Sequence, residues 1–107
     1  MGLVAYASTG SPLAPGTEVD LLNFSVPAGR TLYLQGMTAT GEGLGRFRLF
    51  INNIPKLGYR TSYQDRNALV MLPSDELVGT GIAVEIRVTP YGPTPMNFEG
   101  TLFGAVI

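Results

Sequence analysis

The side chains that most often perform catalysis are scarce in this sequence. It contains no histidine and no cysteine, so the usual general base at neutral pH, the commonest metal ligand and the thiolate nucleophile are all missing. Its serines do not occur in a nucleophile-elbow pattern, and no histidine is present to accept a serine proton. A zinc site made of carboxylates alone would be unusual. The sequence therefore predicts a protein that is not an enzyme and that needs neither a metal nor a cofactor.

Acidic residues form one further pattern, because glycoside hydrolysis uses a pair of carboxylic acids. Glu85 and Glu99 fall on late segments of the chain in which apolar and polar residues alternate. Both occupy polar positions, which predicts that their carboxylates point into solvent rather than into a cleft. The chain also lacks tryptophan, which commonly lines the substrate clefts of such enzymes. A small hydrolase is therefore the least favoured function.

Tyrosine and arginine instead suggest a contact surface. Six of the seven basic residues are arginine, whose planar guanidinium suits protein interfaces better than the lysine ammonium. The two residue types occur together at Tyr59, Arg60, Tyr63 and Arg66, and both are enriched among residues that dominate binding energy. We predict that these four residues form an interface. The alternative is an ordinary sheet edge with its tyrosine hydroxyls in water.

The charge of the chain disfavours nucleic acid as a partner. The formal net charge is −1, so there is no basic excess to collect phosphates. No apolar run approaches the roughly 18 residues of a membrane helix, and the first residues lack the features of a secretory signal peptide. We therefore expect a protein that is made in a cytoplasm and has no membrane partner. Only 14% of the residues are charged, which suggests that part of the surface is covered.

Glycine and proline divide the chain into short segments with the period-two alternation of strands. The clearest is residues 81–89, where Ile82, Val84, Ile86 and Val88 alternate with less apolar residues. The predicted strands are residues 3–8, 17–26, 30–40, 45–51, 56–63, 67–72, 81–89 and 97–107.

Two segments are less regular. Residues 73–78 have residue types that start helices, but Gly79 and Gly81 follow closely, so we predict a loop or a single turn. Phe50 and Phe103 occupy the predicted polar faces of their strands. We expect both rings to be exposed, which suggests either that a partner covers them or that the predicted register is wrong at these positions.

Eight strands in 107 residues predict an all-β fold, an antiparallel β-sandwich that forms one domain over residues 1–107. The favoured form is a jelly roll, in which the two sheets have the strand orders 1-8-3-6 and 2-7-4-5. An immunoglobulin-like sandwich, without its cysteine and tryptophan marks, and a small closed barrel are the alternatives. The predicted core residues are Phe47, Leu49, Val84, Ile86, Phe98 and Leu102.

Four segments carry a resemblance to a known group of proteins: residues 26–34 (VPAGRTLYL), 41–52 (GEGLGRFRLFIN), 84–89 (VEIRVT) and 98–104 (FEGTLFG). The chain from about residue 20 to residue 105 resembles small β-sandwich proteins of tailed-bacteriophage virions. These include capsid decoration (cement) proteins and the base domains of head fibres and spikes. The resemblance implies a structural role in the virion, as a homotrimer bound to the major capsid protein or another virion protein. It also implies synthesis in the host cytoplasm, with release by lysis.

Three functions remain open from the sequence. The first is the structural virion protein, which associates with itself and binds the capsid surface. The second is a carbohydrate- or receptor-binding module of the phage fibre or tail type, because such modules share much of the same strand and turn pattern. The third is the small hydrolase.

Overall fold

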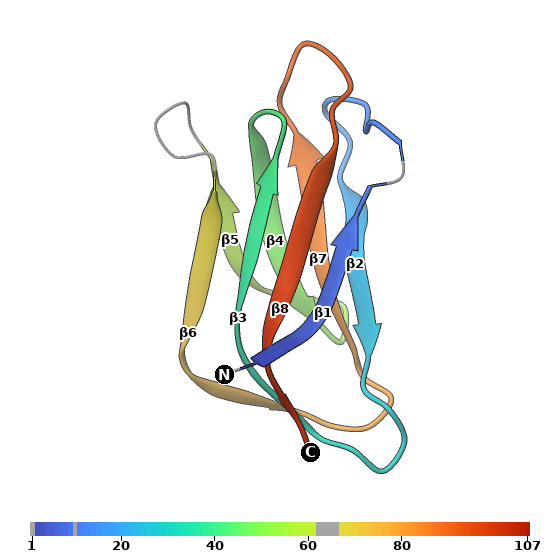
Figure 1. The fold of residues 1–107 in the computed structure, drawn as a ribbon, viewed down its shortest axis with the longest axis vertical. Coiled ribbons are helices and arrows are strands. Elements are labelled where there is room, and N and C mark those ends of the chain that lie inside the picture. Colours follow the sequence, from blue (N-terminus) through green and yellow to red (C-terminus); the bar gives the residue numbers. More distant parts are fainter. Residues whose placement is uncertain (1, 10, 62–66) are drawn as a thin grey trace.

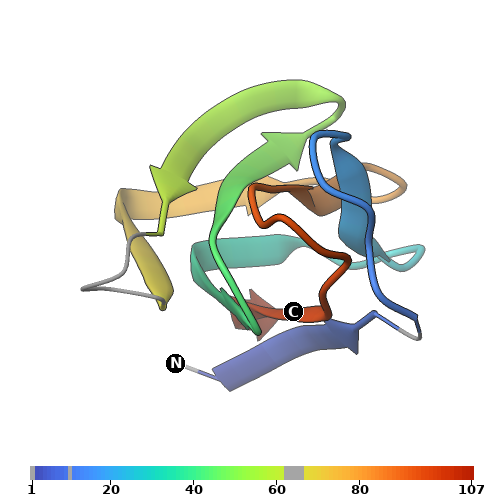
Figure 2. The same ribbon diagram turned by 90° about the horizontal axis from the view of Figure 1, so that it is seen from above.

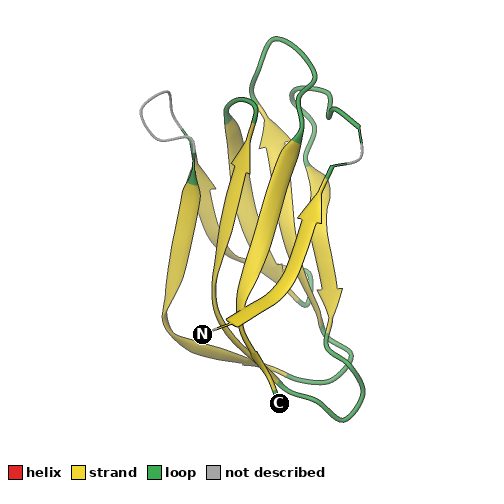
Figure 3. Cartoon of the chain, in the orientation of Figure 1, coloured by secondary structure: helices red, strands yellow, loops and turns green. Residues whose placement is uncertain are grey.

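The computed structural model describes residues 2–9, 11–61 and 67–107, and within these ranges the chain forms eight strands and no helix (Figure 3). No helix in these ranges could therefore cross a membrane. The strands are β1 (Gly2–Ser8), β2 (Val19–Ser25), β3 (Leu32–Gly41), β4 (Gly45–Ile51), β5 (Ile54–Arg60), β6 (Ala68–Val78), β7 (Ala83–Pro90) and β8 (Phe98–Val106).

The described strands pair in two antiparallel sheets, with orders β1-β8-β3-β6 and β2-β7-β4-β5. The sheets pack face to face as a β-sandwich (Figures 1 and 2). The all-β sandwich predicted from the sequence is confirmed, and both strand orders are those written above. Each sheet therefore has one face in the core and one face toward solvent.

The core lies between the two sheets, and it contains every residue predicted for it. Phe47, Leu49, Val84, Ile86 and Leu102 are fully buried, and Phe98 is 2% exposed. The rings of Phe47 on β4 and Phe98 on β8 meet edge to face, with their centroids 5.9 Å apart. This aromatic contact joins the two sheets.

The hairpin between β4 and β5 is tighter than the predicted strand ends imply. Asn52 and Asn53 both have positive φ, 52° and 64°. Two consecutive residues in this region make the two-residue turn whose twist matches a hairpin, and asparagine tolerates the conformation well. As a result, β5 begins at Ile54 rather than at residue 56.

The prediction of a loop or single turn at residues 73–78 is wrong, because β6 continues to Val78. Leu77 pairs with Tyr33 and Val78 pairs with Leu32. Between these pairs and Met71, which pairs with Gly36, the β3–β6 register is irregular. β6 lies at the edge of its sheet, and an edge strand tolerates a proline and an irregular stretch that a central strand does not.

Candidate functional site

The outward side chains of the β1-β8-β3-β6 sheet form rows that cross its strands. In one row Leu3, Phe103, Gly36 and Met71 are register partners. The next row contains Ala105, Tyr33 and Leu77. These two rows lie toward the start of β1 and the end of β8, at the bottom of Figure 1. We call them the apolar half-face: Leu3, Tyr33, Met71, Leu77, Phe103 and Ala105.

Large apolar side chains in this half-face are open to solvent. Leu3 is 65% exposed, Leu77 63% and Met71 47%. Phe103, predicted to be exposed, is half-buried. No position in the two rows carries a charge, and the Tyr33 hydroxyl is the one polar side-chain group in them.

The other half of the same sheet face is lined by hydroxyl groups. Its central row is Tyr6, Thr101, Thr38 and Leu69, one residue from each of the four strands. The next row contains Ser8, Glu99 and Thr40. A hollow of about 270 Å³ lies over these rows, and we call it the Tyr6 hollow. Its lining is Tyr6, Thr38, Ala39, Thr40, Asn67, Ala68, Leu69, Glu99, Gly100 and Thr101.

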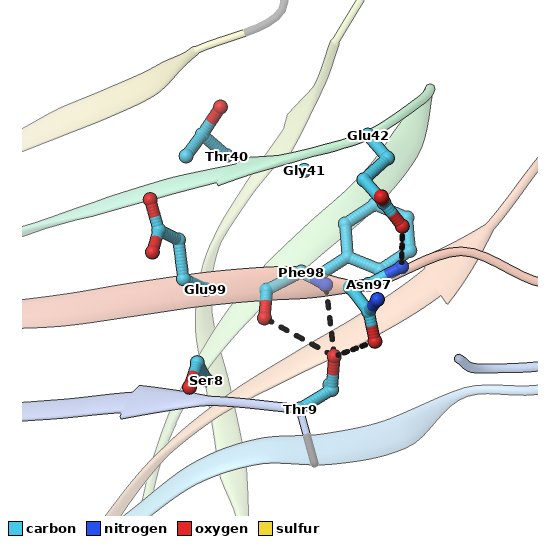
Figure 4. A pocket seen from close by; sticks show the side chains of 8 residues that line it. All are labelled: Ser8, Thr9, Thr40, Gly41, Glu42, Asn97, Phe98 and Glu99. Atoms are coloured by element: carbon cyan, nitrogen blue, oxygen red, sulfur yellow. Dashed lines mark hydrogen bonds between the residues drawn. The ribbon is translucent and has the colours of Figure 1, made fainter. Parts of the chain in front are cut away.

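A second hollow, of about 290 Å³, adjoins the Tyr6 hollow and shares Thr40 and Glu99 with it (Figure 4). Hydrogen bonds gather at its other end. The backbone N–H of Asn97 donates to Glu42 Oε1 over 2.7 Å, and the N–H of Phe98 donates to Thr9 Oγ1 over 3.0 Å. These bonds tie the segments after β1 and β3 to the start of β8, so the walls of this hollow are held by side chain–backbone contacts.

Glu99 also has a defined partner. The Tyr6 hydroxyl donates a hydrogen bond to Glu99 Oε2 over 2.7 Å. This bond raises the pKa of the Tyr6 hydroxyl above its ordinary value, because the carboxylate stabilises the protonated phenol. Glu85, the other acid considered for hydrolysis, points outward from β7 in the opposite sheet. The two carboxylates therefore lie on opposite faces of the sandwich and cannot act on one substrate together.

The outer face of the β2-β7-β4-β5 sheet is organised by charge. Arg48 donates two hydrogen bonds to Glu18, of 2.7 and 2.6 Å, which is a bidentate ion pair. Arg87 bridges Glu85 at 2.6 Å and Asp20 at 3.1 Å. We call these five residues the ion-pair lattice. The hydrogen bonds from Arg48 lower the pKa of Glu18, and those to Glu85 raise the pKa of Arg87.

The ion-pair lattice explains why the prediction that Phe50 is exposed is wrong. Phe50 points outward from β4, yet only 4% of it is exposed. The guanidinium carbons of Arg87 and Arg48 lie 3.9 and 4.8 Å from its ring centroid. The two arginines cover the ring with cation–π contacts, an arrangement that depends on strand pairing and not on the sequence of β4 alone.

The predicted interface residues do not all share a face. Tyr59 is half-buried and packs against the core, whereas Arg60 is exposed. Adjacent residues of a strand point to opposite sides of the sheet, so the sequence itself could have predicted that Tyr59 and Arg60 lie on different faces. The guanidinium carbon of Arg60 lies over the ring of Tyr91, 5.6 Å from the ring centroid. Tyr63 and Arg66 lie outside the described residues.

Arg60 has a basic neighbour that the sequence pattern did not indicate. Arg46 on β4 is its register partner, and across the described residues neither makes a salt bridge. Arg46 also lines a shallow hollow of about 230 Å³ together with Arg48 and Lys56. Like charges on directly opposed strand positions repel one another, so this basic corner, Arg46 and Arg60, would be stabilised by an anionic group.

No protein-family model matches the chain, and no curated protein or solved structure is significantly similar to it. Among the described residues, no group of three or more histidine, cysteine, aspartate or glutamate side chains converges as a metal site would require. What the protein does must therefore be inferred from its surfaces.

Proposed function

We propose that this chain is a non-enzymatic structural protein of a bacteriophage virion, of the capsid decoration type, which assembles with copies of itself and binds the capsid. The observation that carries the proposal is the apolar half-face. Three of its side chains, Leu3, Met71 and Leu77, are 47% or more exposed. Contiguous apolar surface of this kind is typical of protein contacts rather than of a lone molecule in water.

The expected occupant of the apolar half-face is a second copy of the chain. Interfaces between identical subunits are more apolar than other interfaces and are poor in charge, and the half-face has both properties. The outer face of the other sheet is the poorer candidate, because its ion-pair lattice would lose solvation in a contact without gaining new partners. A trimer is the expected assembly.

The basic corner at Arg46 and Arg60 is the candidate contact with the capsid. Two opposed arginines that form no salt bridge among the described residues favour an acidic surface. In a trimer three such corners would engage together, so that each contact can be modest while the whole assembly holds. The strand orders of the two sheets support the further proposal that the sandwich is a jelly roll, and the virion is the location that this function requires.

Sedimentation equilibrium tests the self-association. We expect the wild-type mass to be about three times the 11.4 kDa of one chain. Leu77→Lys should shift the protein toward monomer, because a buried, unpaired ammonium is costly at an apolar interface. Ile54→Lys is the matched control, since Ile54 is 54% exposed but lies on β5 in the other sheet; its mass should not change.

A wild-type protein that remains monomeric at its highest soluble concentration would contradict the proposal. So would an equal effect of Leu77→Lys and Ile54→Lys, since that result would report general solubility rather than a defined interface. The double variant Arg46→Ala/Arg60→Ala should retain the wild-type mass, because the basic corner is assigned to the capsid and not to the contact between copies.

A further inference from the structure

The Tyr6 hollow has two threonines in its middle, between a tyrosine and a leucine at its ends. Thr101 and Thr38 form the middle of its central row, and both are half-buried. Tyr6 and Leu69 stand at the ends of the row, 55% and 62% exposed. Three strand spacings separate these two residues, which is about 14 Å along the row. The hollow is thus broad and shallow, and it is bounded by a ring on one side and an aliphatic side chain on the other.

This arrangement matches the chemistry of a sugar ring. A pyranose has a face of C–H groups that packs on an aromatic ring and a rim of hydroxyls that both donate and accept hydrogen bonds. Threonine hydroxyls can do the same in return, and an ionised carboxylate has acceptor sites for several donors. Glu99 uses one oxygen to accept the bond from Tyr6, which leaves it further capacity at the edge of the hollow.

The Tyr6–Glu99 hydrogen bond prepares the site before any ligand arrives. It joins β1 to β8 and restrains both side chains. Groups that are already restrained lose less conformational entropy on binding, so a shallow site can still hold a small ligand. The second hollow, which shares Thr40 and Glu99, extends this surface toward Glu42 and Asn97 (Figure 4) and gives room for a further sugar unit.

The charged residues that line the two hollows indicate whether an acidic or a neutral sugar would bind more tightly. Among the described residues that line them, Glu42 and Glu99 carry charge and none is an arginine or a lysine. A carboxylate, sulfate or phosphate group on the ligand would meet the like charge of these two carboxylates. Acidic sugars are therefore disfavoured, and a neutral sugar is favoured.

From these observations we propose that the Tyr6 hollow binds a neutral pyranose, as a single ring or as a unit of a neutral glycan. The site is separate from the apolar half-face and from the basic corner, so it goes beyond the assembly role proposed above. A virion protein with such a site would contact cell-surface glycans in addition to its own subunits. The individual affinity is expected to be weak, and several copies in one particle would raise the avidity.

Two-dimensional NMR titration of the whole chain tests the proposal. The neutral probes are glucose, galactose, mannose, N-acetylglucosamine and fucose, with their short oligomers. The acidic probes are glucuronic acid and N-acetylneuraminic acid. We expect at least one neutral sugar to shift amide signals in the central row and at Glu99, and we expect the acidic sugars to bind at least tenfold more weakly.

Three variants locate the site. Tyr6→Ala should weaken binding at least tenfold, since it removes both the ring and the support of Glu99. Tyr6→Phe should retain part of the affinity, because the ring remains while the hydrogen bond is lost. Tyr91→Ala is the matched control, as Tyr91 is 45% exposed but lies outside both hollows; it should bind like wild type. Dispersed spectra show that each variant is folded.

Three results would overturn the proposal: no shift with any neutral probe, shifts that fall outside the hollows, or acidic sugars that bind as well as neutral ones. Sedimentation equilibrium of Tyr6→Ala distinguishes a failure of the sugar-binding proposal from a failure of the assembly proposal. Its mass should equal that of wild type whether or not sugar binding is lost.

Discussion

The outer face of the β2-β7-β4-β5 sheet pairs most of its charges internally, whereas that of the β1-β8-β3-β6 sheet leaves apolar and hydroxyl groups open. On the first, Arg48 and Arg87 satisfy three carboxylates and cover Phe50. On the second, Leu3 and Leu77 are each more than 60% exposed. Both faces come from the same alternation of side chains along strands. Their difference indicates that the lattice mainly stabilises the fold, while the open face is available for partners.

The largest effect is expected where the two sheets meet. Phe47→Ala should lower the free energy of unfolding by about 3–5 kcal/mol, because Phe47 is fully buried and packs edge to face on Phe98. Urea denaturation measures this change. A loss of less than about 1 kcal/mol would mean that Phe47 does not face the core and that the assignment of inner and outer faces is reversed.

Phe50→Ala measures how much the contact between the Phe50 ring and the arginines of the ion-pair lattice contributes to the free energy of unfolding. We expect a loss of about 1.5–3 kcal/mol, the value for burying a large apolar side chain. It should be smaller than the loss for Phe47→Ala, because the covering arginines are flexible and can close over the space. Phe50→Leu, which keeps most of the apolar contact, is the control. If Phe47→Ala and Phe50→Ala lowered the free energy of unfolding equally, the ring under the ion-pair lattice would stabilise the fold as much as the ring in the core, contrary to this prediction.

The pH dependence of stability sharpens the electrostatic side of the comparison. Hydrogen bonds from Arg48 lower the pKa of Glu18 in the folded state. The stabilisation is therefore present above the unfolded pKa of about 4.3 and is lost as the pH falls through the lower folded value. In thermal unfolding, the melting temperature of wild type should be higher than that of Glu18→Gln at pH 7. The difference between the two melting temperatures should shrink as the pH is lowered.

The partner of Glu18 supplies the control for that measurement. Arg48→Met removes the cause of the pKa shift, so its unfolding should lack the same acid-dependent step. A gap between wild type and Glu18→Gln that stays constant down to pH 3 would show that the ion pair does not couple to stability.

The smallest effect on stability is expected on the open face. Leu77→Ser should change the free energy of unfolding by no more than about 0.5 kcal/mol, the usual range for exposed positions. The measurement must be made on dilute monomer, because association would add a concentration-dependent term. The same variant should reduce self-association, and a large loss of monomer stability would show that Leu77 belongs to the fold rather than to a contact surface.

Apart from the extent of β6, the sequence alone determined where the strands and the core lie, because the alternation of apolar and polar residues is a property of each local segment. The alternation at residues 45–51 and 81–89 predicts Phe47 and Ile86 as buried, and both are. The turn at Asn52 and Asn53 is also a local feature, since asparagine tolerates the positive φ that both residues adopt. The same alternation could also have predicted that Tyr59 and Arg60 point to opposite faces of β5.

Only the tertiary structure decided what each outer face became. Phe50 is covered because pairing of β4 with β7 brings Arg87 over its ring. Residues 73–78 end as strand because β3 offers a partner to an edge strand. Tyr6, Thr38 and Leu69 form one row because β8 and β3 align them across the sheet. These contacts join residues far apart in the chain, and their register is set by long-range pairing that no local pattern encodes.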